Sequence, residues 1–416
     1  MDYQGARMTA AQDTDTFTPT MRCLRALVAV ADTGAVLRAA EALNLSQPAV
    51  SRAIHDLEQA LDMPLFERHH GGMLSTRAGD IVSHRFRRAL TQLTQAQEQL
   101  AHLEPAGHFQ RLSLRLSYRN LKVLVEIARS GSEMRAARQL GLTQPTVSAG
   151  LRDLETKLGV PLFQRTPRGM ITTLCGMELI RHVKIAMREL ALVQQDLSAW
   201  RGKISGRVII GALPLTSSLL VPQAVDTLLR ELPGLSIAIY EGSYDTLFEL
   251  LRSGEIDMLV GVLRPLDRKE NMTQKTLFYD RLSTIVRPDH PLLQRANLSL
   301  GELLNADWIA PPQGTPARHS FDQQFHAADL VPPTPVIEAG NLSLLRALLL
   351  NSDRIAMVSP CQMRFEIESA QLAQLPVPLE GPPRAIGILM REDSAPTEAI
   401  QALCRTLEEA SLQLGL

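Results

Sequence analysis

Two segments of the chain, 97 residues apart, carry hydroxyl, amide and guanidinium side chains at matching positions. Amide and hydroxyl groups can hydrogen-bond base edges and phosphates, and an arginine can donate two parallel hydrogen bonds to guanine or to a phosphate. Both segments are therefore predicted to bind double-stranded DNA. The candidate DNA-binding residues are Ser46, Gln47, Pro48, Ser51, Arg52, His55 and Arg68 in the first segment, and Thr143, Gln144, Pro145, Thr146, Ser148, Arg152, Arg165 and Arg168 in the second.

The sequence contains no motif typical of catalysis. It has no G-x-S-x-G elbow, phosphate-binding P-loop, H-E-x-x-H or G-x-G-x-x-G motif. Its four cysteines form no C-x-x-C pair, and its histidines show no metal-ligand spacing. We therefore expect no enzyme, no metal and no cofactor. The chain also lacks an apolar run long enough to span a membrane, and its start does not look like a signal peptide, so a cytoplasmic location is expected.

The two candidate segments lie within an internal repeat. Shifting the sequence by 97 residues places residues 43–66 on residues 140–163, with 13 of 24 positions identical. Solenoid repeats are only about 20 to 50 residues long, so two copies with this longer period are typical of a duplicated domain. The sequence therefore predicts two related domains in tandem.

The pattern within each copy predicts a helix-turn-helix. Ser46 and Thr143 stand where an N-cap hydroxyl can accept hydrogen bonds from the first turn, and Pro48 and Pro145 fall where a missing donor is harmless. The helices that begin there place apolar residues on one side and polar residues on the other. A short turn followed by such a helix is typical of DNA-binding helix-turn-helix proteins. The alternative is a winged helix used only for protein contact.

A wing and a long helix are predicted to follow each helix-turn-helix. The segments PLFERHHGGMLSTRAG and PLFQRTPRGMITTLCG each combine an arginine, a glycine turn and a threonine-rich return, which predicts two strands able to contact phosphate. The residues after each segment place apolar side chains at helical spacing. The apolar stripe of such a helix needs a partner, and we expect at least one of the two helices to form a dimer seam with a second subunit. The alternative is that one of them packs within its own chain.

Charge is distributed unevenly along the chain. Residues 21–100 carry 9 Lys+Arg and 8 Asp+Glu, residues 111–201 carry 15 and 7, and residues 202–416 carry 18 and 25. This distribution is expected if only the first half meets a polyanion. The copies also differ, because Ala149 stands where the first copy has Arg52, whereas the second copy is more basic. We expect the first copy to supply more sequence discrimination and the second more phosphate affinity.

From about residue 203 onward, short apolar strands alternate with helices, which predicts an α/β domain with a largely parallel sheet. In such folds ligands bind at the carboxyl ends of strands, where helix N-termini point N–H groups into a crevice. Polar residues at these turns are therefore candidate effector contacts, although such residues are often only helix caps. They are Thr216, Ser217, Ser218, Gly242, Ser243, Tyr244, Gly314, Thr315, Asn341 and Ser359.

The motifs AAEALNLSQPAVSRAIHDLEQALDMPLFER and AARQLGLTQPTVSAGLRDLETKLGVPLFQR resemble the DNA-binding domain of LysR-type transcriptional regulators. The resemblance implies a winged helix-turn-helix, a linker helix that pairs with its counterpart in another subunit, and a two-lobed effector domain like that of periplasmic binding proteins. One DNA-binding domain per chain is usual in this family, so the tandem copy is a departure. The stretches ALPLTSSLLVP, YEGSYDTL and MLVGVLR are similar to regulators of galactose-binding proteins, which implies a sugar or related metabolite as effector.

Taken together, these patterns predict a mixed fold class: two tandem all-α winged helix-turn-helix domains with long linker helices, then an α/β two-lobed domain of the type 2 periplasmic-binding-protein kind. The expected segments are a disordered extension at 1–20, winged helix-turn-helix domains at 21–79 and 116–176, linker helices at 80–104 and 177–202, and an effector domain at 203–416, with lobe 1 at 203–281 and 384–416 and lobe 2 at 282–383. The predicted function is effector-responsive transcriptional regulation by a homodimer or homotetramer. The alternative is a cytoplasmic small-molecule-binding protein whose repeats serve oligomerisation.

Overall fold

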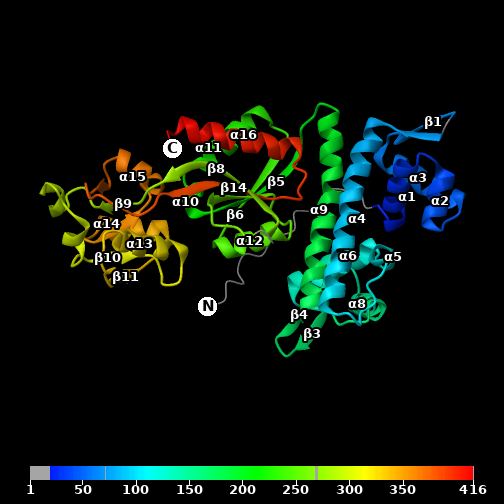
Figure 1. Ribbon diagram of the computed structural model, residues 1–416, viewed down its shortest axis with the longest axis horizontal. Coiled ribbons are helices and arrows are strands. Elements are labelled where there is room, and N and C mark those ends of the chain that lie inside the picture. Colours follow the sequence, from blue (N-terminus) through cyan, green and yellow to red (C-terminus); the bar gives the residue numbers. More distant parts are fainter. Residues whose placement is uncertain (1–18, 71, 268–269, 416) are drawn as a thin grey trace. The chain divides into compact units, whose positions relative to one another are not determined.

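The computed structural model describes residues 19–70, 72–267 and 270–415, which form two compact units (Figure 1). The N-terminal unit contains the described residues up to Ile204 together with Arg252–Glu255, and the C-terminal unit contains the remainder. The extension predicted at residues 1–20 lies outside the described residues except for residues 19 and 20. Among the described residues, no helix has the length and apolar character needed to cross a membrane.

The N-terminal unit contains two runs of elements in the same order, each with three helices followed by an antiparallel two-stranded wing. The first run consists of α1 (Met21–Thr33), α2 (Val36–Leu43), α3 (Gln47–Leu61), β1 (Phe66–His69) and β2 (Gly72–Ser75). The second run consists of α6 (Tyr118–Ser130), α7 (Glu133–Leu140), α8 (Gln144–Leu158), β3 (Phe163–Thr166) and β4 (Gly169–Thr172).

The first helix of each run ends at a glycine in the left-handed conformation, which only glycine adopts without strain. Gly34 has a φ of 67° and Gly131 a φ of 64°. Their carbonyl oxygens accept hydrogen bonds from the wing, from Met73 N–H at 2.8 Å and from Met170 N–H at 2.9 Å. A Cβ on Gly72 would lie 2.2 Å from the carbonyl oxygen of Gly34, so the wing comes too close for a side chain there. These contacts hold each wing against its helices.

A carboxylate on each third helix also fixes the start of the wing. Glu58 Oε1 accepts hydrogen bonds from the backbone N–H groups of Leu65 at 2.8 Å and Phe66 at 3.3 Å. Glu155 makes the equivalent pair of bonds at the start of β3. In both runs, the same pair of carboxylate–backbone hydrogen bonds therefore positions the wing relative to the third helix.

The third helices begin where the sequence predicts, but their caps differ from the prediction. Ser46 and Thr143 are the N-cap residues of α3 and α8, with Pro48 and Pro145 in the first turn. Neither side chain accepts a cap hydrogen bond, and Thr143 Oγ1 instead lies 2.8 Å from Thr146 Oγ1. Proline, as the second helical residue, has no N–H to offer, and the N–H of Ala49, the other donor within reach of the Ser46 hydroxyl, is bonded to the Ser46 carbonyl oxygen at 3.0 Å.

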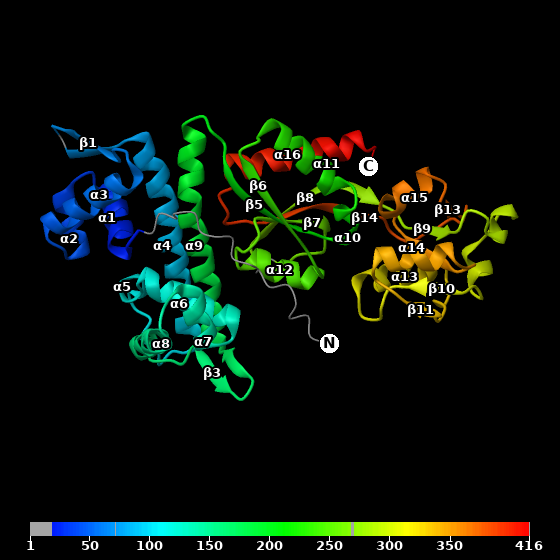
Figure 2. The same ribbon diagram turned by 180° about the vertical axis from the view of Figure 1, so that it is seen from behind.

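Two long helices, α4 (Arg77–Leu103) and α9 (Leu174–Trp200), pack against each other within the chain (Figure 1, Figure 2). They run in opposite directions, because Arg85 near the start of α4 contacts Asp196 near the end of α9. Apolar side chains of both helices belong to one buried core that also includes the two helix-turn-helix runs. Of the two partners considered for the linker stripes, the structure shows the one within the same chain. A short helix that the sequence did not predict, α5 (Leu112–Arg115), lies between the runs.

The C-terminal unit contains two five-stranded sheets, in the orders β6-β5-β7-β14-β8 and β11-β10-β12-β9-β13. The first sheet is made of β5 (Gly206–Ala212), β6 (Leu235–Glu241), β7 (Met258–Val262), β8 (Met272–Asp280) and β14 (Arg384–Arg391). The second is made of β9 (Ser283–Val286), β10 (Trp308–Ala310), β11 (Ile337–Glu338), β12 (Ile355–Val358) and β13 (Ala373–Gln374). The prediction of a largely parallel sheet is wrong for half of each sheet. The returning strand β14 runs antiparallel to both of its neighbours, and β9 does the same in the second sheet.

Helices connect and cover these strands. They are α10 (Pro214–Ser217), α11 (Leu220–Glu231), α12 (Tyr244–Arg252), α13 (Pro316–Ala327), α14 (Leu342–Leu350), α15 (Arg364–Glu368) and α16 (Glu398–Gln413). The helical segment after β5 is divided in two, because α10 ends at Ser217 and α11 begins at Leu220. Pro222 explains the restart, because a proline is tolerated in the first turn of α11 but not in the middle of a longer helix. The sequence also missed α16, which packs against α11.

Candidate DNA-binding surface and effector contacts

The helix α3 presents the predicted contacts of the first run on its exposed side. Its inner side buries Val50, Ile54 and Leu57 in the core, at the spacing of a helix packed along one face. The opposite side leaves a continuous row of hydroxyl, amide and basic groups open to solvent. The exposed candidates are Ser46, Gln47, Pro48, Ser51, Arg52 and His55.

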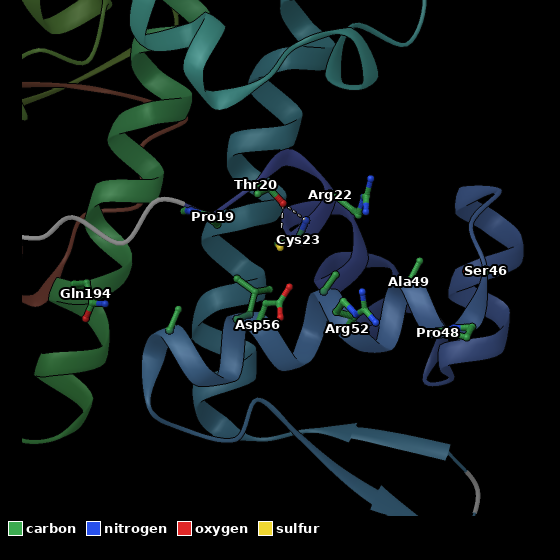
Figure 3. A pocket seen from close by; sticks show the side chains of 13 residues that line it. Pro19, Thr20, Arg22, Cys23, Ser46, Pro48, Ala49, Arg52, Asp56 and Gln194 are labelled. Atoms are coloured by element: carbon green, nitrogen blue, oxygen red, sulfur yellow. Dashed lines mark hydrogen bonds between the residues drawn. The ribbon is translucent and has the colours of Figure 1, made fainter. Parts of the chain in front are cut away.

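A groove of about 1020 Å³ runs beside this helix (Figure 3). Arg52 and Asp56 of α3 line it, together with Arg22 at the start of α1 and Gln194 of α9. Sequence reasoning missed Arg22, which is exposed and adds a second guanidinium to the groove that Arg52 lines. Its counterpart 97 residues later, Arg119, is also exposed, so the self-alignment that revealed the repeat could have identified this pair.

The wings carry the three predicted arginines in exposed positions. Arg68 lies on β1 and Arg165 on β3, at equivalent places in the two hairpins. Arg168 lies at the turn between β3 and β4. Exposed guanidinium groups on a hairpin beside a recognition helix can bind backbone phosphate without reading the sequence.

The helix α8 presents fewer of its predicted contacts than α3. Ser148 is only 6% exposed, contrary to the prediction that it contacts DNA, whereas its counterpart Ser51 is exposed. Ser148 lies in a hollow of about 600 Å³ between α8 and the wing, which Gln144 and Arg165 also line. Thr146 is half-buried. The residues that remain exposed on this helix are Thr143, Gln144, Pro145 and Arg152.

A buried carboxylate in the second run accounts for part of this difference. Glu133 is 6% exposed and accepts a hydrogen bond from Arg165 Nη2 at 2.7 Å and from Gln144 Nε2 at 3.3 Å. Two predicted DNA contacts are therefore drawn toward one acidic side chain. The equivalent position in the first run is Val36, which has no charge. The sequence analysis did not single out Glu133, although comparison of the two copies position by position would have shown this substitution.

The predicted effector contacts lie at strand-to-helix turns, but two of them are interior. Thr216 is fully buried and donates hydrogen bonds to the carbonyl oxygens of Leu213 and Val260. Ser359 is fully buried and donates to Asp280 Oδ1 at 2.5 Å. Both hydroxyls are fully buried, so neither is offered to an effector in this arrangement, unlike the candidates that reach the surface.

The other predicted effector contacts are at least partly exposed. They are Ser217, Ser218, Gly242, Ser243, Tyr244, Gly314, Thr315 and Asn341. Three of these cap helices through their side chains, since Ser243 accepts from Thr246 N–H, Thr315 from Arg318 N–H and Asn341 from Leu344 N–H.

Beside these caps, a guanidinium covers an aromatic ring. The guanidinium carbon of Arg264 lies 3.7 Å from the centre of the Tyr244 ring, and Arg264 also pairs with Asp245 at 3.0 Å. Burial raises the pKa of Tyr244 above its usual value. Sequence reasoning missed Arg264, because nothing in the sequence connects it with a residue 20 positions earlier.

Family comparisons agree with this arrangement of elements. The family described as "LysR substrate binding domain" matches residues 201–411. The family described as "Bacterial regulatory helix-turn-helix protein, lysR family" matches twice, at residues 21–80 and 118–177.

Individual proteins match along most of their length. The HTH-type transcriptional regulator GalR of Pseudomonas putida is 37% identical over 94% of this chain and 97% of its own. The part of this chain outside the alignment is shorter than one helix-turn-helix run, so the alignment includes at least part of both runs. Among solved structures, a full-length single-residue variant of OxyR from Pseudomonas aeruginosa has a TM-score of 0.56 at 20% identity, covering 69% of this chain and 93% of its own. Full-length CbnR in complex with its target DNA has a TM-score of 0.51 at 18% identity, covering 71% and 100%. These two structures share the fold with this chain.

Proposed function

Because the chain belongs to the LysR family of bacterial helix-turn-helix regulators, we propose that it controls transcription with two DNA-reading domains carried on one chain. The observation that carries the proposal is the pair of helices α3 and α8. Each begins with a Gln-Pro turn whose glutamine, Gln47 or Gln144, is exposed, and each follows a hydroxyl residue that caps no N–H group. An exposed amide at the start of a recognition helix can bond a base edge in the major groove. The regulator acts in the cytoplasm, where its DNA is.

The two reading domains contribute unequally. The first offers Arg52 and His55 on the open side of α3, and an arginine there can donate two hydrogen bonds to guanine. The second has Ala149 in place of Arg52, and Glu133 restrains two of its polar groups. Its wing compensates with Arg168, which suits phosphate binding. The first domain therefore supplies most of the sequence discrimination and the second supplies affinity that depends on salt.

The C-terminal unit binds the effector that sets the activity of the regulator. With the buried Thr216 and Ser359 excluded, the candidate effector contacts are the polar turns that follow strands of both sheets. They include Ser243, Thr315 and Asn341. Hydroxyl and amide groups beside helix N-termini suit a small polar molecule, and a sugar or related metabolite fits this chemistry. An effector that favours one arrangement of the two sheets changes DNA binding through linkage between the two sites.

Footprinting of the purified full-length protein on its own upstream region tests this function. Hydroxyl-radical protection is measured with wild-type protein, with Gln47→Ala and with Gln144→Ala, with and without candidate sugars. Two protected groove intervals, each weakened selectively by one of the two substitutions, are expected if both domains read DNA. The exposed Gln139→Ala, outside the recognition helices, serves as the matched control.

The outcomes separate the candidate functions. Protection of a single interval that only Gln47→Ala weakens would mean that α8 does not read DNA, an outcome that the restraint of Gln144 by Glu133 would explain. If the wild-type protein ignored duplex DNA even at low ionic strength, the repeats would serve oligomerisation and the protein would be a small-molecule-binding protein. Unchanged footprints with every effector tested would leave DNA reading intact but would refute a sugar as the regulating ligand.

A further inference from the structure

The long helices α4 and α9 contact each other through two polar clusters that occupy equivalent positions of the repeat. The charged cluster joins Arg85 of α4 to Glu189 and Asp196 of α9. The neutral cluster joins His182 of α9 to Gln92 and Gln99 of α4. A shift of 97 residues places position 85 on 182, 92 on 189 and 99 on 196. The two clusters thus use the same three positions of the repeat, with the helices exchanged. One cluster has an arginine and two carboxylates at these positions, and the other has a histidine and two amides.

The charged cluster is complete and largely shielded from water. Arg85 Nη1 donates to Glu189 Oε2 at 2.7 Å and Arg85 Nε donates to Asp196 Oδ2 at 2.6 Å. Arg88 Nη2 donates to the other oxygen of Glu189 at 2.9 Å. The side chains of Arg85 and Glu189 are each only 3% exposed. Removing the partner of such a group destabilises the fold, because a buried charge without a counter-charge has lost its hydration and gains no ion pair that offsets this loss.

The neutral cluster is built from groups that need no counter-charge. His182 Nδ1 lies 2.9 Å from Gln92 Oε1, and His182 Nε2 lies 3.2 Å from Gln99 Oε1. Burial and the neighbouring Arg181 lower the pKa of His182 to about 3, so the ring is uncharged at neutral pH. Gln92 and His182 are buried. A neutral imidazole has one N–H, so His182 donates from Nδ1 to Gln92 Oε1. Arg181 Nη2 lies 2.9 Å from His182 Nε2 and donates to Gln99 Oε1 at 2.8 Å, and Arg181 is itself paired with Glu178 of the same helix.

These clusters distinguish the pairing of α4 with α9 from either pairing of like helices. If α4 paired with α4 of a second chain in the same geometry, both Arg85 residues would face Gln92 and Gln99 and would have no carboxylate. If α9 paired with α9, Asp196 would take the place of Gln99 beside Arg181, but Glu189 would face only the uncharged His182. Only the mixed pair gives both Arg85 and Glu189 their counter-charges. Specificity of this kind comes from the cost of the wrong pairs as much as from the stability of the right one.

We propose that the charged and neutral clusters direct α4 to pair with α9 of its own chain, so that a single chain forms the two-helix support that linker helices of two subunits otherwise provide. The partner of α4 is therefore α9, and α4 does not pair with α4 of a second chain. Both winged helix-turn-helix domains are then held in one chain at a fixed ratio of one to one. Resting on the proposed function, a consequence is that the target DNA has two unequal half-sites read by one molecule.

Exchanging the carboxylates and amides between the helices tests the pairing. The four-residue variant Gln92→Glu, Gln99→Asp, Glu189→Gln and Asp196→Gln keeps the net charge of the chain. It makes α4 complementary to another α4 and leaves Arg85 facing amides in the intrachain pair. The matched control adds Arg85→His and His182→Arg, which moves the arginine and its two carboxylates to the other end of the contact and restores the partners of the exchanged residues within the chain. The half-buried Arg88 faces an amide at position 189 in both variants, so its loss is the same in each.

The readout is the distance between spin labels on α4 and α9, measured by pulsed electron paramagnetic resonance. Labels replace the exposed Thr91 and Gln194 through a non-natural amino acid, which leaves the four native cysteines untouched. The full-length labelled protein is diluted into excess unlabelled protein, unfolded and refolded together, so that a distance between chains disappears and a distance within one chain persists. Light scattering gives the mass of each species.

The wild-type protein and the six-residue control are expected to keep one short distance after dilution. The four-residue variant is expected to lose it, with a mass at least about twofold higher through pairing of like helices. The inference is overturned if the wild-type distance vanishes on dilution, or if the four-residue variant keeps both the distance and the wild-type mass. Loss of folding in both variants would overturn it too, because the control restores the partners of all six exchanged residues, whereas unfolding of the four-residue variant alone would support it. None of these results depends on DNA binding, so failure here is distinguishable from failure of the proposed function.

Discussion

The substitution Glu133→Val gives the sharpest test of how the second recognition helix is controlled. It places in α7 the residue that the first run has at the same position, Val36. In the wild-type protein, Arg165 Nη2 and Gln144 Nε2 each donate to Glu133, at 2.7 Å and 3.3 Å, and these donors reach DNA only by giving up those bonds. Removing the carboxylate therefore frees both groups and also removes a negative charge beside the phosphates. We expect Glu133→Val to bind DNA more tightly than the wild-type protein.

The size of the effect follows from the contacts that are released. The Arg165 side chain is 68% exposed, so its ion pair is screened by water and is worth about 0.2–1 kcal/mol. The hydrogen bond to Gln144 adds about 0.5–1.5 kcal/mol. Together they amount to about 1–2 kcal/mol, or about 5- to 30-fold in affinity. If Arg165 gains one phosphate contact, the slope of log K against log salt becomes steeper by about 0.9.

Fluorescence anisotropy with the footprinted duplex, titrated between about 50 and 200 mM salt, measures both quantities. Glu133→Gln is the matched variant that keeps the shape of the side chain without its charge, and it should gain part of the affinity. The reciprocal change Val36→Glu should weaken binding by the first domain. Unchanged affinity and slope in Glu133→Val would refute the reasoning, and weaker binding would mean that Glu133 positions Gln144 and Arg165 for DNA instead of withholding them.

Three further predictions concern residues whose surroundings are known. Arg52→Ala should cost about 1–3 kcal/mol of discrimination at one base pair, whereas Arg168→Ala should lower the salt slope by about 0.9 with little change in base preference; competition assays with mutated duplexes check both, and equal loss of discrimination would contradict the division of roles. Arg85→Gln leaves Asp196 without a guanidinium and Glu189 with Arg88 as its one remaining ion-pair partner, and it should lower the free energy of unfolding by no more than about 3–5 kcal/mol in urea titrations; Arg85→His with Glu189→Gln and Asp196→Gln, which copies the neutral cluster, should recover most of the loss. The pKa of His182 is lowered to about 3 in the folded state, below its unfolded value of about 6.5, so unfolding binds a proton and the free energy of unfolding should fall by up to about 1.4 kcal/mol for each pH unit below 6.5. Between pH 6.5 and about 5.5, above the range where most carboxylates titrate, His182→Gln should remove this slope, and an equal slope in the variant would assign it to another group.

Much of the local structure could be predicted because it is encoded by neighbours in the sequence. Gly34 and Gly131 mark helix ends where only glycine is comfortable, and Pro48 and Pro145 fix the start of the recognition helices within one turn. The apolar spacing of α3 also separates its buried side from its exposed side, so the exposure of Gln47 followed from periodicity alone. Even here one detail was beyond local reasoning: Ser46 occupies the N-cap but makes no cap bond.

The sequence by itself determined where the two helix-turn-helix runs begin and end, that their recognition helices expose amides, and that an α/β segment follows. It could not decide how those pieces meet. Ser148, Thr216 and Ser359 have the residue types of surface contacts, yet the folded chain buries all three. An apolar stripe on a helix shows that the helix packs against something, but the sequence does not show against which segment. Only the tertiary structure therefore shows that α4 pairs with α9 and that Arg85 contacts Glu189, 104 residues away. Local patterns fix local conformation, whereas contacts between distant segments depend on which surfaces are complementary once every element has formed.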